Sequence, residues 1–141
     1  MNRIGYQIIF TIITLVLLGS AVFAQEHVPP VKPIQTGRSP GVKVKQIGQS
    51  GSSKTYVLIF AKGDEILSGL TEFAQKYNVK NARFTAMGDA LSAKVGWYDK
   101  SKKMFKVIPI TEPAEITSLV GDIAVYNDKP AVHAHINLAT Q

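Results

Sequence analysis

Residues 56–77 read YVLIFAKGDEILSGLTEFAQKY, and this stretch holds a strand, a turn and a helix in succession. Its first six residues are apolar and rich in β-formers, which predicts a buried strand. A Lys-Gly-Asp turn follows, in which Asp64 is the expected helix N-cap and Glu65 lies in the first helical turn. Apolar side chains then recur at steps of three and four residues, so we expect an amphipathic helix over residues 65–77 that ends at Asn78.

The chain after this helix is rich in strand signals. Five apolar segments are separated by Gly, Asp, Asn or Pro and are expected to form strands: residues 82–87, 93–98, 103–110, 116–126 and 131–138. One main helix among about six strands predicts an α+β fold, in which a mixed, mostly antiparallel sheet packs against the helix on one face. The last strand runs to the end of the sequence with no closing element. We therefore expect the domain, residues 54–141, to be truncated at its C-terminus.

Residues 25–53 are punctuated by proline and glycine, which predicts a flexible tether rather than part of a core. Within this segment, Val42, Val44 and Ile47 could add a short edge strand. The tether is expected to join the α+β domain to the N-terminal segment.

The first 24 residues have the order of a secretory signal: a basic Arg3, then an apolar run, then small residues. Val22 and Ala24 occupy the −3 and −1 positions of a cleavage site, so processing is expected after Ala24. An uncleaved membrane anchor is the alternative, because the apolar run is long enough to span a bilayer of about 30 Å. In both cases the remaining chain lies outside the cytoplasm, and the protein is expected to be periplasmic or secreted.

The composition of the chain excludes several classes of protein. It has 141 residues, no cysteine, and 16 Lys plus Arg against 10 Asp plus Glu, for a formal net charge of +6. Without cysteine there is no disulfide scaffold, zinc ribbon, thiol nucleophile or iron–sulfur cluster. A hydrophobic fraction of 45% excludes a disordered chain. The mean hydropathy of +0.07 is positive because of the apolar signal segment. No nucleophile elbow, P-loop or dinucleotide fingerprint occurs in the sequence.

Five ordered motifs carry a resemblance to a known family. They are YVLIFAKGDEI (residues 56–66), MGDAL (87–91), VGWYD (95–99), EPAEITSLVGDI (112–123) and PAVHAH (130–135). In this order they resemble the PPC domain, also called DUF296, which occurs in plant AT-hook nuclear proteins and in bacterial and archaeal single-domain proteins. The fourth motif looks like the Glu-Ile-x-Ser-Leu-x-Gly block of that family, its most recognisable stretch.

The resemblance implies a homotrimer of α+β subunits and a fold similar to that of acetolactate decarboxylase, in which histidines hold zinc. It also implies a DNA-binding role, by which the family is usually described. The sequence departs from the family pattern in two ways. It lacks the Gly-Gly-His segment that usually follows the His-x-His strand, and it carries an export signal.

His133 and His135 are the principal candidates for a metal site. At positions i and i+2 of a strand, both imidazoles project from the same face and could bind one zinc or other divalent ion. A catalytic zinc normally takes three protein ligands, and Glu115 or a symmetry-related subunit could supply the third. The alternative is a pair of ordinary sheet histidines with local hydrogen bonds, beside a Glu115 that pairs with a lysine at the entry of a strand.

Four lysines form the one dense basic patch of the sequence: Lys100, Lys102, Lys103 and Lys106. They could neutralise nucleic-acid phosphates without sequence specificity. A solvated hairpin tip that protects an edge strand from aggregation is the ordinary explanation of such a run. The tether has Gly-Arg-Ser-Pro at residues 37–40 in place of the Arg-Gly-Arg-Pro hook of plant relatives, so it could not lay two guanidinium groups along a minor groove.

Together these features predict an exported, trimeric binding module of the PPC type. Its expected cleft is lined by His133, His135 and Glu115 and holds a metal or a small anionic ligand. DNA binding through the lysine patch is the alternative, which export disfavours because an exported protein meets little chromosomal DNA. A zinc-dependent, decarboxylase-like enzyme rests on fold analogy alone and is the least favoured hypothesis. Contact with a membrane is expected only through an uncleaved signal segment.

Overall fold

The computed structural model describes residues 24–30 and 33–140. The elements in these ranges, in chain order, are β1 (His27–Val28), β2 (Lys43–Ser50), β3 (Ser53–Ile59), α2 (Ile66–Lys76), β4 (Ala82–Ala90), β5 (Ala93–Asp99), β6 (Met104–Ile110), β7 (Ala114–Tyr126) and β8 (Lys129–Ala139). The strands pair antiparallel. The signal predicted for residues 1–24 lies, up to residue 23, outside the described residues. In the described ranges no helix is long and apolar enough to cross a membrane.

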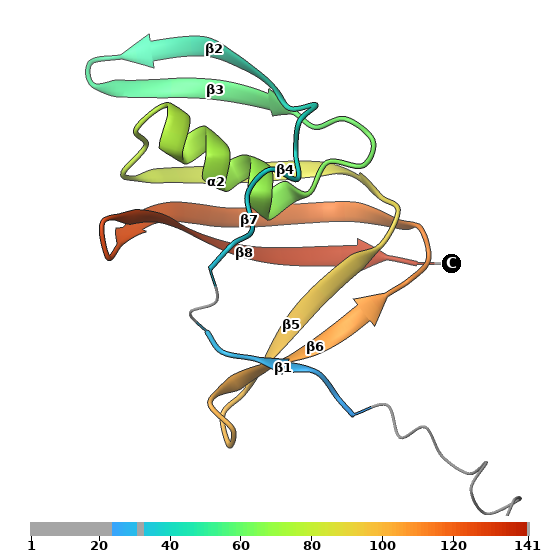
Figure 1. Ribbon diagram of the computed structural model, residues 1–141. Coiled ribbons are helices and arrows are strands. Elements are labelled where there is room, and N and C mark those ends of the chain that lie inside the picture. Colours follow the sequence, from blue (N-terminus) through green and yellow to red (C-terminus); the bar gives the residue numbers. More distant parts are fainter. Residues whose placement is uncertain (1–23, 31–32, 141) are drawn as a thin grey trace, which may run out of the picture.

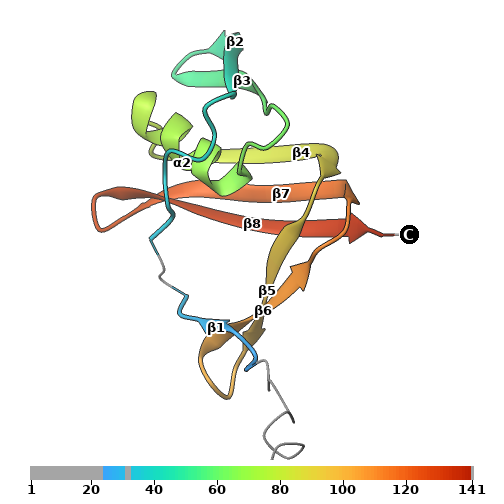
Figure 2. The same ribbon diagram turned by 45° about the vertical axis from the view of Figure 1, so that its right-hand side comes forward.

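Helix α2 lies between a two-stranded hairpin and a three-stranded sheet. The hairpin is β2–β3, and the sheet has the strand order β4-β7-β8. Figures 1 and 2 show the helix between these two layers, while the β5–β6 hairpin extends from one end of the sheet, away from the helix. The core is small: Phe73 and Ala74 of the helix and Ile123 of β7 are buried, and partly buried side chains of both layers surround them. The predicted α+β architecture, mostly antiparallel with one main helix, is confirmed.

Helix α2 begins one residue later than predicted. Glu65, not Asp64, is the N-cap, and its carboxylate accepts hydrogen bonds from the backbone N–H groups two and three residues ahead (3.2 and 2.7 Å). Asp64 instead accepts from the N–H groups of Ala61 (2.8 Å) and Gly41 (3.0 Å), so it closes the preceding turn and holds the incoming loop. At the other end Asn78 has a φ of 51°, the left-handed conformation expected of the residue that ends a helix.

Residues 25–53 are not an uninterrupted tether. They contain β1 and β2, and the short edge strand expected within them is an eight-residue strand paired with β3. The loop before β2 is held against α2, because the N–H of Gly37 donates to Glu72 (2.6 Å) and that of Arg38 donates to the Ser68 hydroxyl (3.1 Å). The Ser68 hydroxyl, which donates to Glu72 at 2.7 Å, and the Gly37 N–H hold the pKa of this carboxyl below its ordinary value. Long-range hydrogen bonds thus order a segment whose composition predicts flexibility.

Two other strands differ from the prediction. β3 ends at Ile59 and is half-buried rather than buried, because it belongs to a two-stranded hairpin: alternate side chains face the helix, while Val57 and Ile59 are 40% and 60% exposed. β4 runs to Ala90, three residues beyond the strand predicted for residues 82–87, and its pairing with β7 shifts register just before Gly88. Gly88 has a φ of 148°, which glycine adopts without steric cost.

Strands β7 and β8 approach closely at Gly121, which lies opposite Ala134. A Cβ atom at Gly121 would overlap the backbone carbonyl oxygen of His133 and would lie 2.6 Å from Cζ of Phe84 on β4. The ring of Phe84 therefore fills the space that a side chain would take. Gly121 sets the spacing between β7 and the strand that carries both candidate histidines.

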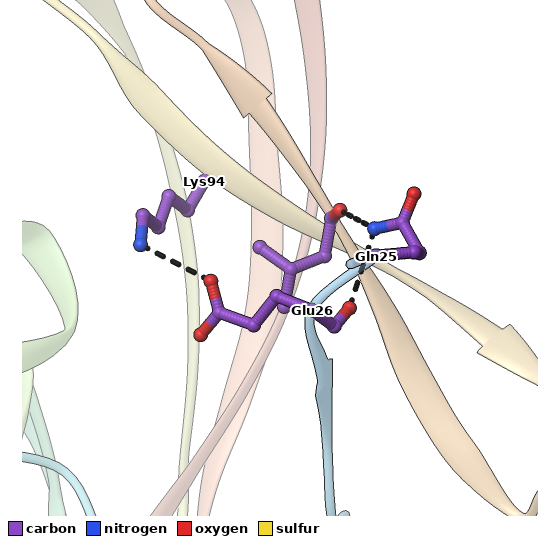
Figure 3. Close-up of polar contacts among 4 residues, drawn as sticks. Gln25, Glu26 and Lys94 are labelled. Carbon is purple, nitrogen blue, oxygen red and sulfur yellow. Dashed lines mark hydrogen bonds and ion pairs between the residues drawn. The ribbon is translucent and has the colours of Figure 1, made fainter. Parts of the chain in front are cut away.

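The segment around β1 is held on the outer edge of β6. Figure 3 shows its contacts: the Gln25 side-chain amide donates to the Val107 carbonyl (2.6 Å), and the Glu26 carboxylate forms an exposed ion pair with Lys94 of β5 (3.3 Å). The Val107 N–H also donates to the Glu26 carbonyl at 2.9 Å. The residues that follow the predicted cleavage position, Ala24, are thereby fixed to the sheet.

Candidate functional site

The candidate histidines lie on the face of the β4–β7–β8 sheet that points away from α2. In the strand register, His133 lies opposite Asp122 of β7, which in turn lies opposite Arg83 of β4. Residues directly opposite in antiparallel strands share a face, so these three form one row. His135 lies in the next row, beside Val120. All these side chains are exposed, whereas alternate residues of the same strands pack in the core against the helix.

The rings of His133 and His135 meet edge to face. Their Nε2 atoms lie 3.1 Å apart, their centroids are 4.8 Å apart, and the ring planes are inclined by 82°. The Nε2 separation is that of a hydrogen bond in which one neutral ring donates and the other accepts. The structure therefore brings the two imidazoles together, as their two-residue spacing on a strand predicts.

Glu115 lies away from the histidine pair of its own chain. It is exposed and lies opposite Ala139 of β8, whereas His135 lies four residues earlier on that strand. Four residues of strand correspond to roughly 13 Å. Among residues 24–30 and 33–140, no three His, Cys, Asp or Glu side chains are grouped so that they could hold a metal ion. Contrary to the expected cleft, the register of β7 and β8 separates Glu115 from the two histidines within one chain.

The histidine pair fits two ligand positions of a tetrahedral metal ion. Two nitrogen atoms bound to one zinc at about 2.0–2.1 Å are about 3.3 Å apart when their bonds form a tetrahedral angle. The observed 3.1 Å separation of the Nε2 atoms is close to this value. The carboxylate of Asp122, opposite His133, adds a negative charge that favours a cation.

The predicted lysine patch lies at the tip of the β5–β6 hairpin, and its four side chains are exposed: Lys100, Lys102, Lys103 and Lys106. The Asp99 carboxylate organises this turn. It accepts from the hydroxyl (2.6 Å) and the N–H (2.9 Å) of Ser101 and from the N–H of Lys102 (3.2 Å). The Ser101 hydroxyl and then the Lys102 N–H hold the pKa of Asp99 below its ordinary value.

Sequence reasoning did not single out two side chains that lie beside the lysine patch. Trp97 of β5 lies opposite Lys106 and is 70% exposed, although tryptophan is highly buried on average. His27, which the sequence assigns to the tether, lies opposite Lys106 on β1, and its Nε2 is 3.2 Å from Nζ of Lys102. Trp97, Lys106 and His27 therefore form a row across three strands. No local pattern indicates that β1 pairs with β6, so this row could not be found without the structure.

Three solved structures share the fold. A protein from Bacteroides thetaiotaomicron, described as a candidate DNA-binding protein, is 21% identical with a TM-score of 0.62; the match covers 69% of this chain and 64% of that one, so this chain spans less than two thirds of its length. A plant- and prokaryote-conserved (PPC) protein from Pyrococcus horikoshii is 24% identical, with a TM-score of 0.54 and coverage of 77% and 68%. A metal-containing protein from Archaeoglobus fulgidus is 23% identical, with a TM-score of 0.54 and coverage of 79% and 69%. These likenesses establish the fold alone.

The family follows from the sequence itself. No curated protein matches it. The model of one protein family, described as the Plants and Prokaryotes Conserved (PCC) domain, matches residues 47–141, a range that includes all five motifs of the PPC resemblance. The match covers well over half of the chain. The chain therefore belongs to the Plants and Prokaryotes Conserved (PCC) domain family.

Proposed function

We propose that the protein is a binding module that holds a divalent transition metal through His133 and His135. The observation that carries the proposal is the 3.1 Å separation of their Nε2 atoms on an exposed sheet face. Imidazole nitrogens suit zinc, copper, iron and nickel, and two that converge on one position supply half of a tetrahedral ligand set.

The surrounding residues favour a metal that binds a small anion rather than a buried structural ion. When bound, the metal supplies a Lewis-acidic position for a carboxylate or phosphate. His133 and His135 would hold the metal, Asp122 would offset part of its charge, and Arg83, which lies opposite Asp122 on the next strand, would supply a guanidinium to pair with the anion. The Archaeoglobus relative is described as metal-containing, but its likeness concerns the fold, so the proposal rests on the histidine geometry. The relationship to acetolactate decarboxylase remains a prediction.

Zinc titration of the purified protein tests this proposal. Zinc ion is expected to bind the wild type, measured by calorimetry, and to raise its Tm, because a ligand that binds only the folded state stabilises it. His133→Ala and His135→Ala should each remove most of the binding and most of the Tm shift. His27→Ala is the matched control, since this histidine lies on β1 in another sheet. If zinc does not bind the wild type, or binds His133→Ala equally well, the proposal fails.

We further propose that the protein is exported and self-associates. The order of basic, apolar and small residues in the first 24 residues supports export. The family resemblance supports a homotrimer, and the small core supports association, because large apolar side chains such as Met87 (82%) and Leu91 (55%) are exposed. N-terminal sequencing of the protein from the periplasm or medium is expected to begin at Gln25. A mass other than three chains in sedimentation equilibrium would contradict the trimer.

Nucleic-acid binding by the β5–β6 hairpin is a second candidate function. The observation that favours it is the row of Trp97, Lys106 and His27 beside the exposed turn lysines. An exposed aromatic ring offers a stacking surface for a base, and the lysines around it neutralise phosphates. Trp97 is the one tryptophan of the chain, so its fluorescence reports directly on this surface.

Titration with a single-stranded oligonucleotide tests the second candidate. Quenching of Trp97 fluorescence is expected near about 50 mM salt and should weaken steeply by about 200 mM. Replacement of Lys102, Lys103 and Lys106 by glutamine should weaken binding, whereas the matched replacement of three lysines on the β2–β3 hairpin should not: Lys43, Lys45 and Lys54. No binding at the lower salt concentration would exclude this function.

A further inference from the structure

Strand β7 contains a β-bulge next to the histidine pair. Its register with β8 skips Thr117, and on the β4 side a single residue, Met87, spans both Thr117 and Ser118. β7 therefore has one more residue here than either neighbouring strand. Bulges occur preferentially at sheet edges and next to functional sites, where they redirect a side chain. Because β7 lies between β4 and β8, a location next to a functional site accounts for this bulge better than a location at an edge.

The bulge places two hydroxyl-bearing residues on the face that carries the histidines. The core residues on either side of it are Ile116 and Leu119, which are buried. Regular strand alternation leaves one outward residue between neighbouring core positions, whereas here there are two, Thr117 and Ser118. Thr117 is exposed and Ser118 is half-buried. The extra residue thus adds a hydrogen-bonding group to the outer face while both core positions are kept.

Ser118 and Asn137 form a hydrogen-bonded pair beside His135, here called the bulge pair. Asn137 lies two residues after His135 on β8, so both side chains project from one face. The Asn137 amide donates to Ser118 Oγ at 2.8 Å, and the Thr117 hydroxyl donates to the backbone carbonyl of Asn137 at 3.3 Å. Because Ser118 Oγ is the acceptor, its own O–H can donate to a ligand, as can the second N–H of the Asn137 amide. The bulge pair therefore offers two hydrogen-bond donors next to the histidine pair.

We propose that the anion taken by the metal site is a short dicarboxylate, with one carboxylate on the metal held by His133 and His135 and the other on the bulge pair. The inference rests on the proposed metal-binding function. The midpoint of the two histidines is Ala134, three residues from Asn137, which is about 10 Å along β8. A metal–oxygen bond of about 2 Å and a hydrogen bond of about 2.8 Å cover about 5 Å of this distance. The ligand itself must span the remaining half.

This span selects the ligand by its length. Acetate has a single carboxylate and is too short to reach both ends, whereas succinate carries a carboxylate at each end of a short carbon chain. Arg83 lies in the row of His133 and would pair with the carboxylate on the metal, whatever the length of the ligand. Glu115 sets the upper limit: it lies opposite Ala139, two residues beyond Asn137, so the far carboxylate of a longer ligand such as adipate would meet a like charge.

Calorimetric titration of the zinc-loaded protein with acetate, succinate and adipate tests this selection. Succinate is expected to bind about tenfold or more tightly than acetate, and more tightly than adipate. Ser118→Ala and Asn137→Ala should each weaken succinate binding about tenfold, because each removes a hydrogen bond to a charged group. Both variants should bind zinc and acetate as the wild type does, since acetate does not reach the bulge pair. Ser53→Ala, which removes an exposed hydroxyl of β3 in another sheet, is the matched control and should change none of these affinities.

The possible failures are distinguishable. Equal affinity of the zinc-loaded wild type for acetate and succinate, or an equal loss of both in Ser118→Ala, would overturn the dicarboxylate site and leave the metal-binding function standing. A loss of zinc affinity in Ser118→Ala would also overturn it, because the bulge pair would then support the histidines rather than contact the ligand. Absence of zinc binding by the wild type would overturn the metal-binding function and this inference with it.

Discussion

Replacement of Gly121 by alanine is expected to destabilise the domain severely. The added methyl group would overlap the carbonyl oxygen of His133, and it would lie 2.6 Å from Cζ of Phe84 and 3.0 Å from Cα of Ala134. Two of these neighbours are backbone atoms of β8, so the paired strands must separate to admit the methyl group. Overpacking of an interior site costs about 1–3 kcal/mol, and the backbone overlap places Gly121→Ala near the upper value.

The expected loss is measurable by thermal unfolding followed by circular dichroism. At about 4–8 °C per kcal/mol for a domain of this size, a loss of about 3 kcal/mol lowers Tm by roughly 12–24 °C. Gly48→Ala is the matched control, because it also adds a methyl group to a strand glycine but meets its nearest neighbour, Thr55, at 3.8 Å. Its Tm should stay within about 4 °C of the wild type. A second control, Phe84→Ala combined with Gly121→Ala, should not restore stability, since the backbone overlap remains. A Gly121→Ala protein with the same Tm as the Gly48→Ala control would refute the reasoning.

Three further substitutions test the helix and its loop. Glu65→Ala removes both hydrogen bonds of the N-cap and should cost about 1 kcal/mol in denaturant unfolding; no loss would mean that the cap is unimportant. Gly69→Ala should lower Tm although alanine favours helices, because its Cβ would lie 2.6 Å from Cε1 of Phe60; a higher Tm would contradict this close packing. Glu72 has a lowered pKa in the folded state, mainly through the Ser68 hydroxyl, so the ionised carboxylate stabilises the fold above its ordinary value of 4.5. The Tm advantage of the wild type over Glu72→Gln should therefore be full at pH 7 and disappear as the pH falls through the lowered native pKa, whereas a constant difference down to acid pH would contradict this.

Predictions that depend on local geometry agree with the structure. The helix expected over residues 65–77 was predicted from the spacing of its apolar residues. That spacing shows only that one side of the helix is buried, and it does not depend on which layer covers that side. α2 occupies all but the ends of the expected range. The convergence of His133 and His135 follows from strand alternation in the same way, because residues i and i+2 share a face in any sheet order.

Predictions that depend on long-range pairing failed. Asp64 was expected to cap the helix, but Gly41, 23 residues away in the sequence, binds its carboxylate. Glu115 was expected beside the histidines, but the register of β7 and β8, with its shift between residues 116 and 118, places it opposite Ala139. Asp122 was overlooked because only that same register shows that it faces His133. Strand register is decided by the packing of whole faces, and no single motif encodes it.

Because β1 pairs with β6, the segment that directly follows Ala24 is not a flexible linker. Gln25 contacts the sheet through its side chain, so the first residue after Ala24 is already attached to β6. On the proposal that residues 1–24 are an export signal, an uncleaved signal would keep the β5–β6 hairpin near the membrane surface, where its lysines would meet anionic headgroups. If the proposed signal is instead cleaved after Ala24, the new amino terminus is the exposed Gln25, which stays attached to β6 through its side chain. In both cases, the attachment of residues 25–28 to β6 keeps the β5–β6 hairpin close to Ala24.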